Sequence, residues 1–362
     1  MRNALIKNLA VEMLLDLLKT YSPPRGERQA VEILGKYAEK LGYEHVEVDE
    51  VGNLIASYGK GDRTLALIGH IDTIPWKIPI SVSGDEIQGR GAVDAKGPLV
   101  AGFIGFALAK DFVNTGKYKI YAIALVDEEG ESIGAKHLVR KGFRAKGVVI
   151  AEPTNTNGVV IGYRGSLKVR VYCTGRGGHS SMGSSGSACE KLIGIWNVLK
   201  NKGYDNVGVN HNTAVLLKLE CGEDMPVIPR EGSALIQVRI GIDNDPESVI
   251  HDIRNAISSM DGCEWDLIEF TKPVKSSINN EVARALIRAL LRAGQKPRVL
   301  YKHGTSDMNI LFPVITEDMI AYGPGRSELA HSAEERISMD ELKKGIEIYR
   351  RLVEEWCVLN EG

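Results

Sequence analysis

Apolar and polar positions alternate in two ways along the first 163 residues of the chain. Short apolar runs bounded by turn residues predict strands near 44–48, 52–58, 65–71, 118–126 and 147–151. Apolar residues at helical spacing predict helices at 4–20, 27–41, 97–110 and 131–140. Strands that alternate with helices in this way predict an α/β sheet covered by helices on both faces.

The order of the predicted elements changes between about 164 and 274. The elements there are strand 166–173, helix 187–201, strand 213–221, strand 232–242, helix 246–259 and strand 264–271. This β-α-β-β-α-β order is typical of a complete ferredoxin-like module. The remainder returns to helix 280–293, strands near 298–301 and 318–322, and helix 339–357, which Ser338 caps. We therefore expect residues 1–163 and 275–362 to form one α/β domain, with residues 164–274 inserted in it.

Composition and charge exclude several classes of protein. The 362 residues include 45 basic and 47 acidic side chains, which are well mixed along the chain. No basic face predicts nucleic-acid binding, and neither a polybasic run nor ~18 continuous apolar residues predicts a membrane. The five cysteines are odd in number and include no Cys-x-x-Cys pair. We therefore expect neither a disulfide framework nor a thiolate zinc site, and a reduced cytoplasm fits best.

The first candidate for chemistry lies at the end of the apolar run 65–71. His70 and Asp72 are two residues apart there, so their side chains point the same way from an extended chain. A metal-binding histidine needs such a carboxylate, which accepts its second ring N–H and fixes its tautomer. Taken alone, the pair is equally compatible with a structural histidine at a strand end.

Three further carboxylates lie at turns beside predicted elements. Asp94 lies in the glycine-rich turn 89–97, which lacks the Gly-x-x-x-x-Gly-Lys-Ser/Thr pattern of a phosphate loop. Glu128 and Glu129 directly follow the apolar strand 118–126. Carboxylates at the end of a buried strand are costly unless cations neutralise them; the alternative is a solvated surface cluster.

Two more residues are candidate metal ligands, and with them the candidate set consists of histidines and carboxylates. Glu152 follows strand 147–151, and His331 lies in the glycine-containing loop 322–332. Ligands of an α/β sheet collect at the carboxyl ends of its strands, so one crevice is expected to hold these side chains. Histidine and carboxylate ligands suit zinc, cobalt or manganese, and two such ions bridged by a carboxylate would form a hydrolytic centre.

With these motifs in this order, the chain resembles the dinuclear-metal family of peptidases and amidohydrolases over essentially its whole length. That family includes succinyl-diaminopimelate desuccinylases, acetylornithine deacetylases and glutamate carboxypeptidases. The resemblance implies an exopeptidase-like catalytic domain, an inserted lid that dimerises, and two divalent metal ions per subunit, Zn2+ or Co2+. It implies one ion held by His70, Asp94 and Glu152, another held by Asp94, Glu129 and His331, Asp72 as the partner that orients His70, and Glu128 as general base.

The resemblance also implies functional residues in and beside the inserted module. His179, in the glycine-rich loop 174–181, matches a histidine that reaches the partner subunit's active site and stabilises the oxyanion. An isolated histidine of this kind would be an ordinary loop residue. An arginine binds a carboxylate well through paired hydrogen bonds, although Arg239 has the alternative of an ordinary strand-surface charge. The positions that resemble substrate-anchoring residues are Arg164, Ser166, Arg239, Gly304 and Thr305.

Four stretches are similar to a narrower branch, the LysW-lysine and LysW-ornithine hydrolases. These stretches are 21–27, 91–99, 277–280 and 303–311. Members of the branch release lysine or ornithine from the C-terminal glutamate of a small acidic carrier protein. Ala95 and Pro98 stand where much of the broad family has methionine and glycine, and this departure favours the branch.

The resemblance thus implies metal-dependent amide hydrolysis on a LysW-like acidic carrier protein, by a cytoplasmic homodimer, in lysine or arginine biosynthesis. The alternatives with the same centre are an acetylornithine deacetylase, a succinyl-diaminopimelate desuccinylase or a dipeptidase. A non-catalytic carrier-binding protein is the alternative from another class. An intact Glu128 and a full ligand set argue against it, because binding alone needs neither.

Overall fold

The computed structural model describes residues 2–183 and 186–361 and divides into two compact units. Unit 1 comprises Met1–Ile161, Ser276–Leu300 and Ile310–Gly362, and unit 2 comprises Gly162–Lys275 and Tyr301–Asn309. The sequence predicts a division after residue 163 and again after residue 274. The segment Tyr301–Asn309, which we expected in the α/β domain of residues 1–163 and 275–362, belongs to unit 2.

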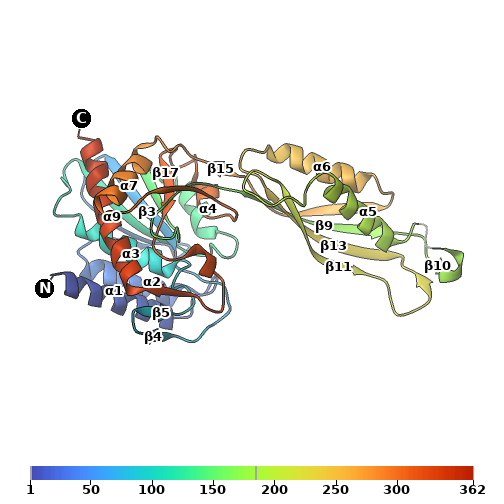
Figure 1. The fold of residues 1–362 in the computed structure, drawn as a ribbon, viewed down its shortest axis with the longest axis horizontal. Coiled ribbons are helices and arrows are strands. Elements are labelled where there is room, and N and C mark those ends of the chain that lie inside the picture. The colour runs from blue at the N-terminus through green and yellow to red at the C-terminus, as the bar shows by residue number, and fades with distance from the viewer. Residues whose placement is uncertain (1, 184–185, 362) are drawn as a thin grey trace. The chain divides into compact units, whose positions relative to one another are not determined.

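Unit 1 is built on a mixed sheet with the strand order β1-β2-β6-β3-β7-β17-β8, in which β16 also pairs with β8. The strands β6, β3, β7 and β17 run parallel, and β2 and β8 flank them in antiparallel orientation. All residues from Leu65 to His70 in β3 are buried, so both faces of the sheet are covered, because successive side chains point to opposite faces. The strands are β1 (His45–Val48), β2 (Leu54–Tyr58), β3 (Arg63–His70), β6 (Tyr118–Leu125), β7 (Gly147–Ala151), β8 (Gly158–Tyr163), β16 (Arg298–Lys302) and β17 (Met319–Tyr322) (Figure 1).

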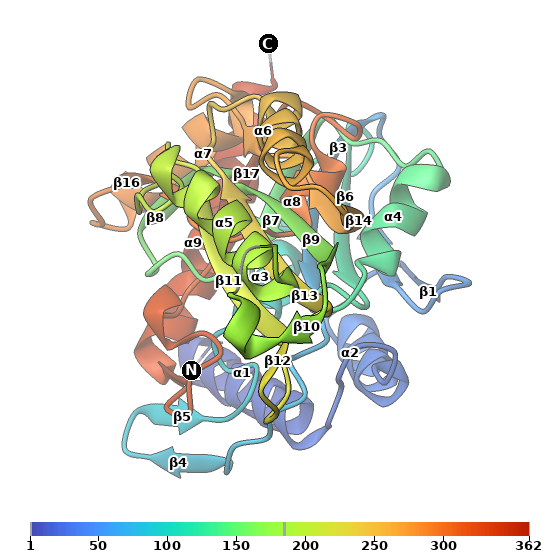
Figure 2. The ribbon, with the colours of Figure 1, turned by 90° about the vertical axis from the view of Figure 1, so that its right-hand side faces the viewer.

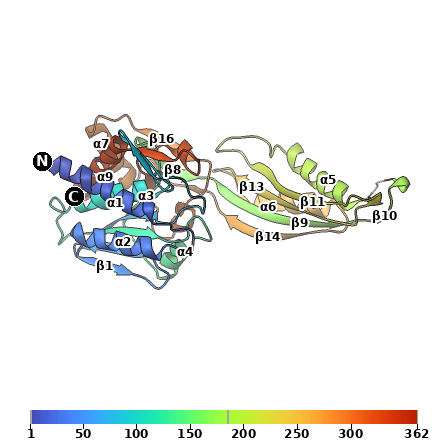
Figure 3. The ribbon, with the colours of Figure 1, turned by 90° about the horizontal axis from the view of Figure 1, so that it is seen from below.

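The helices of unit 1 pack on this sheet and on one another. The helix α3 is buried along most of its length, because it contacts β3 and β6. It also lies against α1 and α9 (Figure 3). The predicted start of α9 is confirmed, since Ser338 Oγ accepts a hydrogen bond from Glu341 N and the Glu341 side chain accepts one from Ser338 N. Among the described helices, none is long and apolar enough to cross a membrane. The helices are α1 (Arg2–Lys19), α2 (Arg28–Lys40), α3 (Lys96–Leu108), α4 (Ile133–Arg140), α7 (Glu281–Arg292) and α9 (Met339–Leu359), and the short α8 (Met308–Leu311) begins in unit 2 and ends in unit 1.

A smaller sheet joins two distant segments of unit 1. Its central strand β5 (Glu86–Gln88) pairs with β4 (Ser81–Ser83), as Figure 2 shows. On its other side, β5 pairs with β18 (Arg336–Ser338). The segment that follows His331 therefore lies beside the segment that leads to Asp94.

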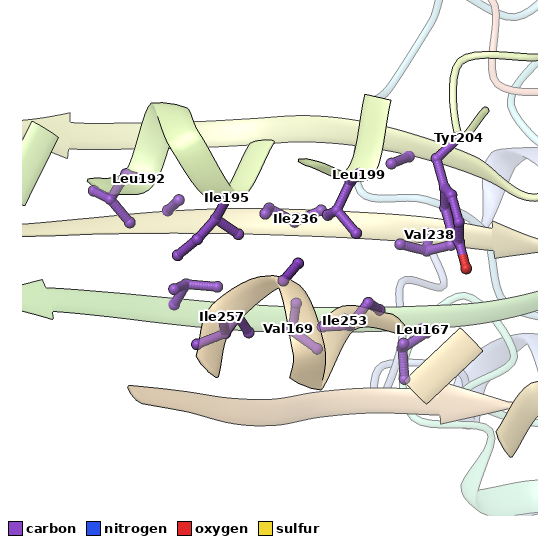
Figure 4. Packing of buried hydrophobic residues seen from close by; sticks show 14 of the residues in the cluster. Leu167, Val169, Leu192, Ile195, Leu199, Tyr204, Ile236, Val238, Ile253 and Ile257 are labelled. Carbon is purple, nitrogen blue, oxygen red and sulfur yellow. The ribbon is translucent and has the colours of Figure 1, made fainter. Parts of the chain in front are cut away.

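Unit 2 has the β-α-β-β-α-β order predicted from the sequence. Its antiparallel sheet runs in the order β11-β13-β9-β14. Side chains of the two helices, among them Ile195 and Ile253, pack against Val169, Ile236 and Val238 of the sheet (Figure 4). The elements are β9 (Gly165–Thr174), α5 (Ala188–Asn201), β11 (Thr213–Cys221), β13 (Glu231–Ile240), α6 (Pro246–Ser258) and β14 (Cys263–Thr271), with the short strands β10 (Gly178–His179), β12 (Val227–Ile228) and β15 (Val274–Lys275).

The expectation that the chain has no disulfide framework is wrong for unit 2. Cys173 and Cys263, which are directly opposed on β9 and β14, form one disulfide, and Cys189 and Cys221 form another between α5 and β11. Among the described residues only Cys357 is a free cysteine, and it is buried in α9. The spacing of the cysteines in the sequence did not reveal these bridges, because the partners are 90 and 32 residues apart and meet only in the folded chain. The cysteines therefore no longer support a reduced cytoplasm.

Candidate metal centre

The ends of four parallel strands in unit 1 deliver predicted ligands to one edge of the sheet. His70 is the last residue of β3, Glu128 and Glu129 follow β6, Glu152 follows β7, and His331 lies in the loop after β17. The carboxyl ends of parallel strands share one edge, which is where ligands bind to α/β sheets. The structure thus brings together residues that are far apart in the sequence.

Asp94 lies between the two histidines. Its Oδ1 is 3.2 Å from His70 Nε2, and its Oδ2 is 3.2 Å from His331 Nε2. Glu152 Oε1 lies 3.9 Å from His70 Nε2, and Glu129 Oε1 lies 2.7 Å from His331 Nε2. The ligand atoms of each group, His70 with Asp94 and Glu152 or Asp94 with Glu129 and His331, lie within 4.8 Å of one another. A carboxylate shared by two such groups is the arrangement that a dinuclear centre needs.

Glu128 lies beside these groups. Its carboxylate is within 4.8 Å of ligand atoms of His70 and Glu129, and its side chain is partly buried. That proximity suits either a ligand or a general base.

Asp72 is fully buried and organises two elements at once. Its backbone carbonyl lies 3.0 Å from His70 Nδ1, whereas its carboxylate Oδ1 lies at 3.4 Å. The two carboxylate oxygens accept hydrogen bonds from the backbone N–H groups of Glu128, at 3.2 Å, and Glu129, at 2.9 Å. The carbonyl is therefore the nearer acceptor for His70, and the carboxylate also holds the turn that carries both glutamates.

Negative charge dominates the electrostatics of this site. Hydrogen bonds with Asp94 and Glu129 raise the pKa of His331 to about 10. Burial lowers the pKa of His70, but contacts with Asp72 and Asp94 outweigh burial, and this pKa lies well above its usual value. Burial acts to raise the pKa of Asp94, and its hydrogen bonds with the two histidines outweigh burial and hold this pKa well below its usual value. The site attracts positive charge, as a cation site must.

The donor set fits two divalent cations. The side chains of Asp94, Glu129 and Glu152 are only 14%, 11% and 13% exposed, so three carboxylates share a largely buried region. Buried charges of one sign are unfavourable unless opposite charge compensates them. Imidazole nitrogens and carboxylate oxygens are ligands that zinc and similar ions accept.

A buried acid outside the predicted set supports the glutamate turn. Glu27 Oε1 accepts hydrogen bonds from the backbone N–H groups of Arg25, at 2.9 Å, and Asp127, at 3.0 Å. Asp127 in turn accepts a hydrogen bond from Glu131 N at 3.0 Å. The sequence analysis missed Glu27 because no local pattern distinguishes it from other acidic residues near helix starts.

Arg164 and Arg239 lie together in unit 2. Arg239 in β13 is directly opposite Ser166 in β9, and Arg164 precedes β9. Arg164 is buried, and its Nη2 donates to His211 O, Thr213 Oγ1 and Arg239 O at 2.6, 2.8 and 2.9 Å. Burial, followed by the charge of Arg239, lowers the pKa of Arg164. Two neighbouring cations of this kind favour an anionic ligand.

The remaining predicted anchors differ in their exposure. Ser166 is fully buried and accepts a hydrogen bond from Gln237 Nε2 at 3.2 Å. Gly304 and Thr305 are half-buried in the part of unit 2 formed by Tyr301–Asn309. Ser166 and Arg164 thus serve the internal hydrogen bonds of unit 2. Burial lowers the pKa of the Arg239 guanidinium, and the charge of Glu269 opposes this shift.

His179 is exposed on the ribbon formed by β10 and β12 in unit 2, opposite Val227. Its Nδ1 accepts a hydrogen bond from the backbone N–H of Ser181 at 3.2 Å and lies 2.9 Å from Ser181 Oγ. A backbone N–H can only donate, so the neutral ring carries its proton on Nε2. His179 therefore presents an N–H donor, which the predicted oxyanion role requires.

The sequence matches a known protein family and aligns with known relatives along nearly its whole length. The sequence profile of Peptidase family M20/M25/M40 matches residues 66–355. The chain belongs to this family. This M20 chain is also 36% identical, over 354 residues and 97% of each chain, to the LysW-lysine/LysW-ornithine hydrolases of Saccharolobus islandicus and Saccharolobus solfataricus.

Solved structures share the fold of this M20 protein. The M20 metallo-carboxypeptidase Sso-CP2 of Sulfolobus solfataricus aligns with a TM-score of 0.79 at 20% identity, over 96% of this chain and 99% of its own. The aminopeptidase PepT of Bacillus cereus aligns with a TM-score of 0.81 at 21% identity, over 97% and 99%. The YXEP protein of Bacillus subtilis, a dinuclear metal binding peptidase, gives 0.77 at 14% identity, over 99% of each. The predicted fold class and the class of metal-dependent hydrolase are confirmed.

Proposed function

We propose that this M20 protein hydrolyses the amide that joins lysine or ornithine to the C-terminal glutamate of a small acidic carrier protein of the LysW type. The observation that carries the proposal is its similarity, along 97% of the chain, to LysW-lysine/LysW-ornithine hydrolases. Proteins that share the fold include a carboxypeptidase and an aminopeptidase, so the fold alone does not select the substrate.

The proposed centre holds two ions, Zn2+ or Co2+. When bound, the ions polarise the amide carbonyl and make a water molecule more acidic. Asp72 holds His70 Nδ1 and the glutamate turn, so that His70 Nε2 and both glutamates keep their orientation. The proposed ligands are His70, Asp94 and Glu152 for one ion and Asp94, Glu129 and His331 for the other.

Glu128 is the proposed general base. One of its carboxylate oxygens takes a proton from the attacking water and later gives that proton to the departing amine. The oxygen of the water bonds to the carbonyl carbon and the C–N bond then breaks, so the amino acid leaves as an amine and the carrier regains a free glutamate carboxyl group. The proton that Glu128 takes from water is thus the one that it gives to the amine, and the carboxylate is regenerated.

Unit 2 is proposed to act as a lid and as the dimerisation domain. In a homodimer, the Nε2–H of His179 would donate to the oxyanion in the partner subunit. Arg239 would bind a substrate carboxylate, with Arg164 and Ser166 behind it and with Gly304 and Thr305 as further contacts. Both the carrier terminus and the released amino acid carry carboxylates that such a group recognises.

The cytoplasm remains the proposed location, in lysine or arginine biosynthesis. Disulfides are rare in the cytosol of most organisms, but intracellular proteins of hyperthermophilic archaea and bacteria are rich in them. The two bridges of unit 2 are therefore compatible with this location.

Mass spectrometry of the products tests the substrate. The metal-loaded protein is incubated in parallel with a lysine-charged carrier, acetylornithine, succinyl-diaminopimelate and a dipeptide. Release of lysine from the carrier alone supports the proposal, whereas cleavage of a free small amide instead would keep the mechanism and replace the substrate. A protein that retains two ions and hydrolyses none of these compounds would support a non-catalytic carrier-binding function.

A further inference from the structure

Glu335 is a buried carboxylate of unit 1 that the proposed mechanism does not use. Its side chain has no exposed surface, and it follows His331 closely in the sequence. Its Oε1 accepts hydrogen bonds from the backbone N–H groups of Gly91, Val93 and Asp94, each at 3.0 Å. Three donors converge on one oxygen, so the turn that carries Asp94 is fixed relative to Glu335.

The remaining atoms of Glu335 are also held. Its Oε2 accepts a hydrogen bond from Arg90 Nη1 at 2.7 Å, and Arg90 Nε donates to Trp76 O at 2.7 Å. The backbone carbonyl of Glu335 accepts a hydrogen bond from Gly89 N at 3.1 Å, beside the paired strands β5 and β18. These bonds, one of which is a charge-assisted pair with Arg90, hold the Glu335 side chain and backbone in place.

We infer that Glu335 is a positioning residue of the metal centre, which sets the place of the Asp94 carboxylate. The inference rests on the dinuclear centre of the proposed function. Asp94 faces His70 with one oxygen and His331 with the other, each at 3.2 Å. A shift of the Asp94 backbone therefore changes both ligand groups together. A shift of Glu152, which belongs to only one group around Asp94, would change that group alone.

A purely structural role for Glu335 leads to a different expectation. Any buried acceptor that satisfies three backbone N–H groups contributes to stability, whether or not a metal binds nearby. The matched control is Glu355 in α9, which is also buried and pairs with Arg292. Glu355→Gln thus measures the cost of changing a buried carboxylate that pairs with an arginine of α7 rather than with the Asp94 turn.

The test compares cobalt binding by Glu335→Gln and Glu355→Gln, using visible absorption and calorimetry on the full chain. Glutamine keeps the volume of the side chain, but its single oxygen cannot accept from both Arg90 and the three backbone N–H groups, which use different oxygens of Glu335. We expect Glu335→Gln to weaken the binding of both ions by about 10- to 100-fold, the usual effect of changes behind metal ligands, and to alter the cobalt spectrum. Glu355→Gln should lower the melting temperature and leave the cobalt affinities and spectrum unchanged.

Wild-type cobalt affinities and spectrum in a folded Glu335→Gln protein would overturn the inference. Failure of the wild-type protein to bind a second ion would contradict the proposed centre instead, so the two failures are distinguishable. If Glu335→Gln does not fold, Arg90→Lys replaces it, because this change loosens Glu335 from one side only. Arg90→Lys should then alter the cobalt spectrum to a smaller extent, and an unchanged spectrum would again overturn the inference.

Discussion

The two units keep their functional side chains in place by different means. In unit 1, most of the proposed metal ligands lie at or just after strand ends, and buried carboxylates such as Asp72 and Glu27 hold the adjoining turns through backbone N–H groups. In unit 2, the segment that carries His179 lies between Cys173 and Cys189, and a disulfide ties each of these cysteines to another element. The turn that carries the two glutamates of unit 1 is thus held by buried hydrogen bonds, whereas the segment that carries His179 in unit 2 is bounded by covalent links.

The extent of the buried core in each unit explains this difference. Unit 1 has strands such as β3 that are buried on both faces, so a carboxylate beneath its surface is shielded from water and its hydrogen bonds persist. The core of unit 2 consists of a four-stranded sheet with two helices packed on it. Small units bury a smaller fraction of their surface and are often reinforced by disulfides. A buried polar network therefore positions the glutamate turn of unit 1, and disulfides restrain the segment around His179 in the smaller unit 2.

The largest expected effect concerns the catalytic chemistry of unit 1. Glu128→Gln keeps the size of the side chain but removes the proton acceptor, so we expect kcat to fall by about 10²- to 10⁴-fold with both ions still bound. Glu131→Gln is the matched control, because Glu131 belongs to the same acidic cluster, is largely exposed and pairs with Arg25. Turnover and metal content are measured on the same samples. Near-normal turnover in metal-replete Glu128→Gln would show that another group is the base.

The next effect tests whether unit 2 depends on its covalent links. Replacing both Cys173 and Cys263 by serine should lower the free energy of unfolding of unit 2 by about 2–4 kcal/mol. The partners are 90 residues apart, whereas those of the bridge between Cys189 and Cys221 are 32 apart, so removal of the second bridge should have the smaller effect. Chemical denaturation, with and without a dithiol reductant, measures both changes.

Unit 1 is the internal control for that experiment. Its cysteine Cys357 is free and buried, so the reductant should leave the unfolding of unit 1 unchanged. If the reductant leaves the unfolding of unit 2 unchanged, the bridges do not stabilise it. The comparison between a hydrogen-bonded unit and a cross-linked unit would then no longer hold.

Short-range patterns were enough to predict much of this molecule. Apolar runs that end near His70, Glu128 and Glu152 locate strand ends, and parallel strands place those ends at one edge. Ser338 and Glu341 encode the start of α9 within a few residues, because a capping box is a local structure. The order of elements in unit 2 also follows from local periodicity.

Long-range partners could not be predicted in this way. Glu27 and Glu335 resemble many other acidic residues until distant segments meet around them. The bridge between Cys173 and Cys263 depends on the register of β9 against β14, which a single sequence does not specify. The segment Tyr301–Asn309 continues a stretch of unit 1 in the sequence, and only packing assigns it to unit 2.

A third prediction concerns the cost of burying carboxylates in unit 1. Burial, helped by the charge of Glu281 and opposed by a hydrogen bond from Val282 N, raises the pKa of Asp318 to about 6. The folded protein then holds this proton more tightly than the unfolded chain, so stability falls as pH rises from about 4 to about 6. The loss should reach up to about 3 kcal/mol and should be absent in Asp318→Asn. Denaturation across this range measures it, and equal slopes for the two proteins would assign the pH dependence to another group.

The smallest expected effect compares one helix cap in each unit. Ser338 caps α9 of unit 1 in a capping box with Glu341, whereas Ser187 caps α5 of unit 2 through one hydrogen bond from a backbone N–H. Each change of these serines to alanine should cost about 1 kcal/mol of stability. In the oxidised protein, Ser187→Ala should cost less, because the bridge between Cys189 and Cys221 restrains the first turn of α5. Reduction should then increase the cost of Ser187→Ala without changing that of Ser338→Ala, and denaturation curves that show no such increase would mean that the bridge does not hold this helix start.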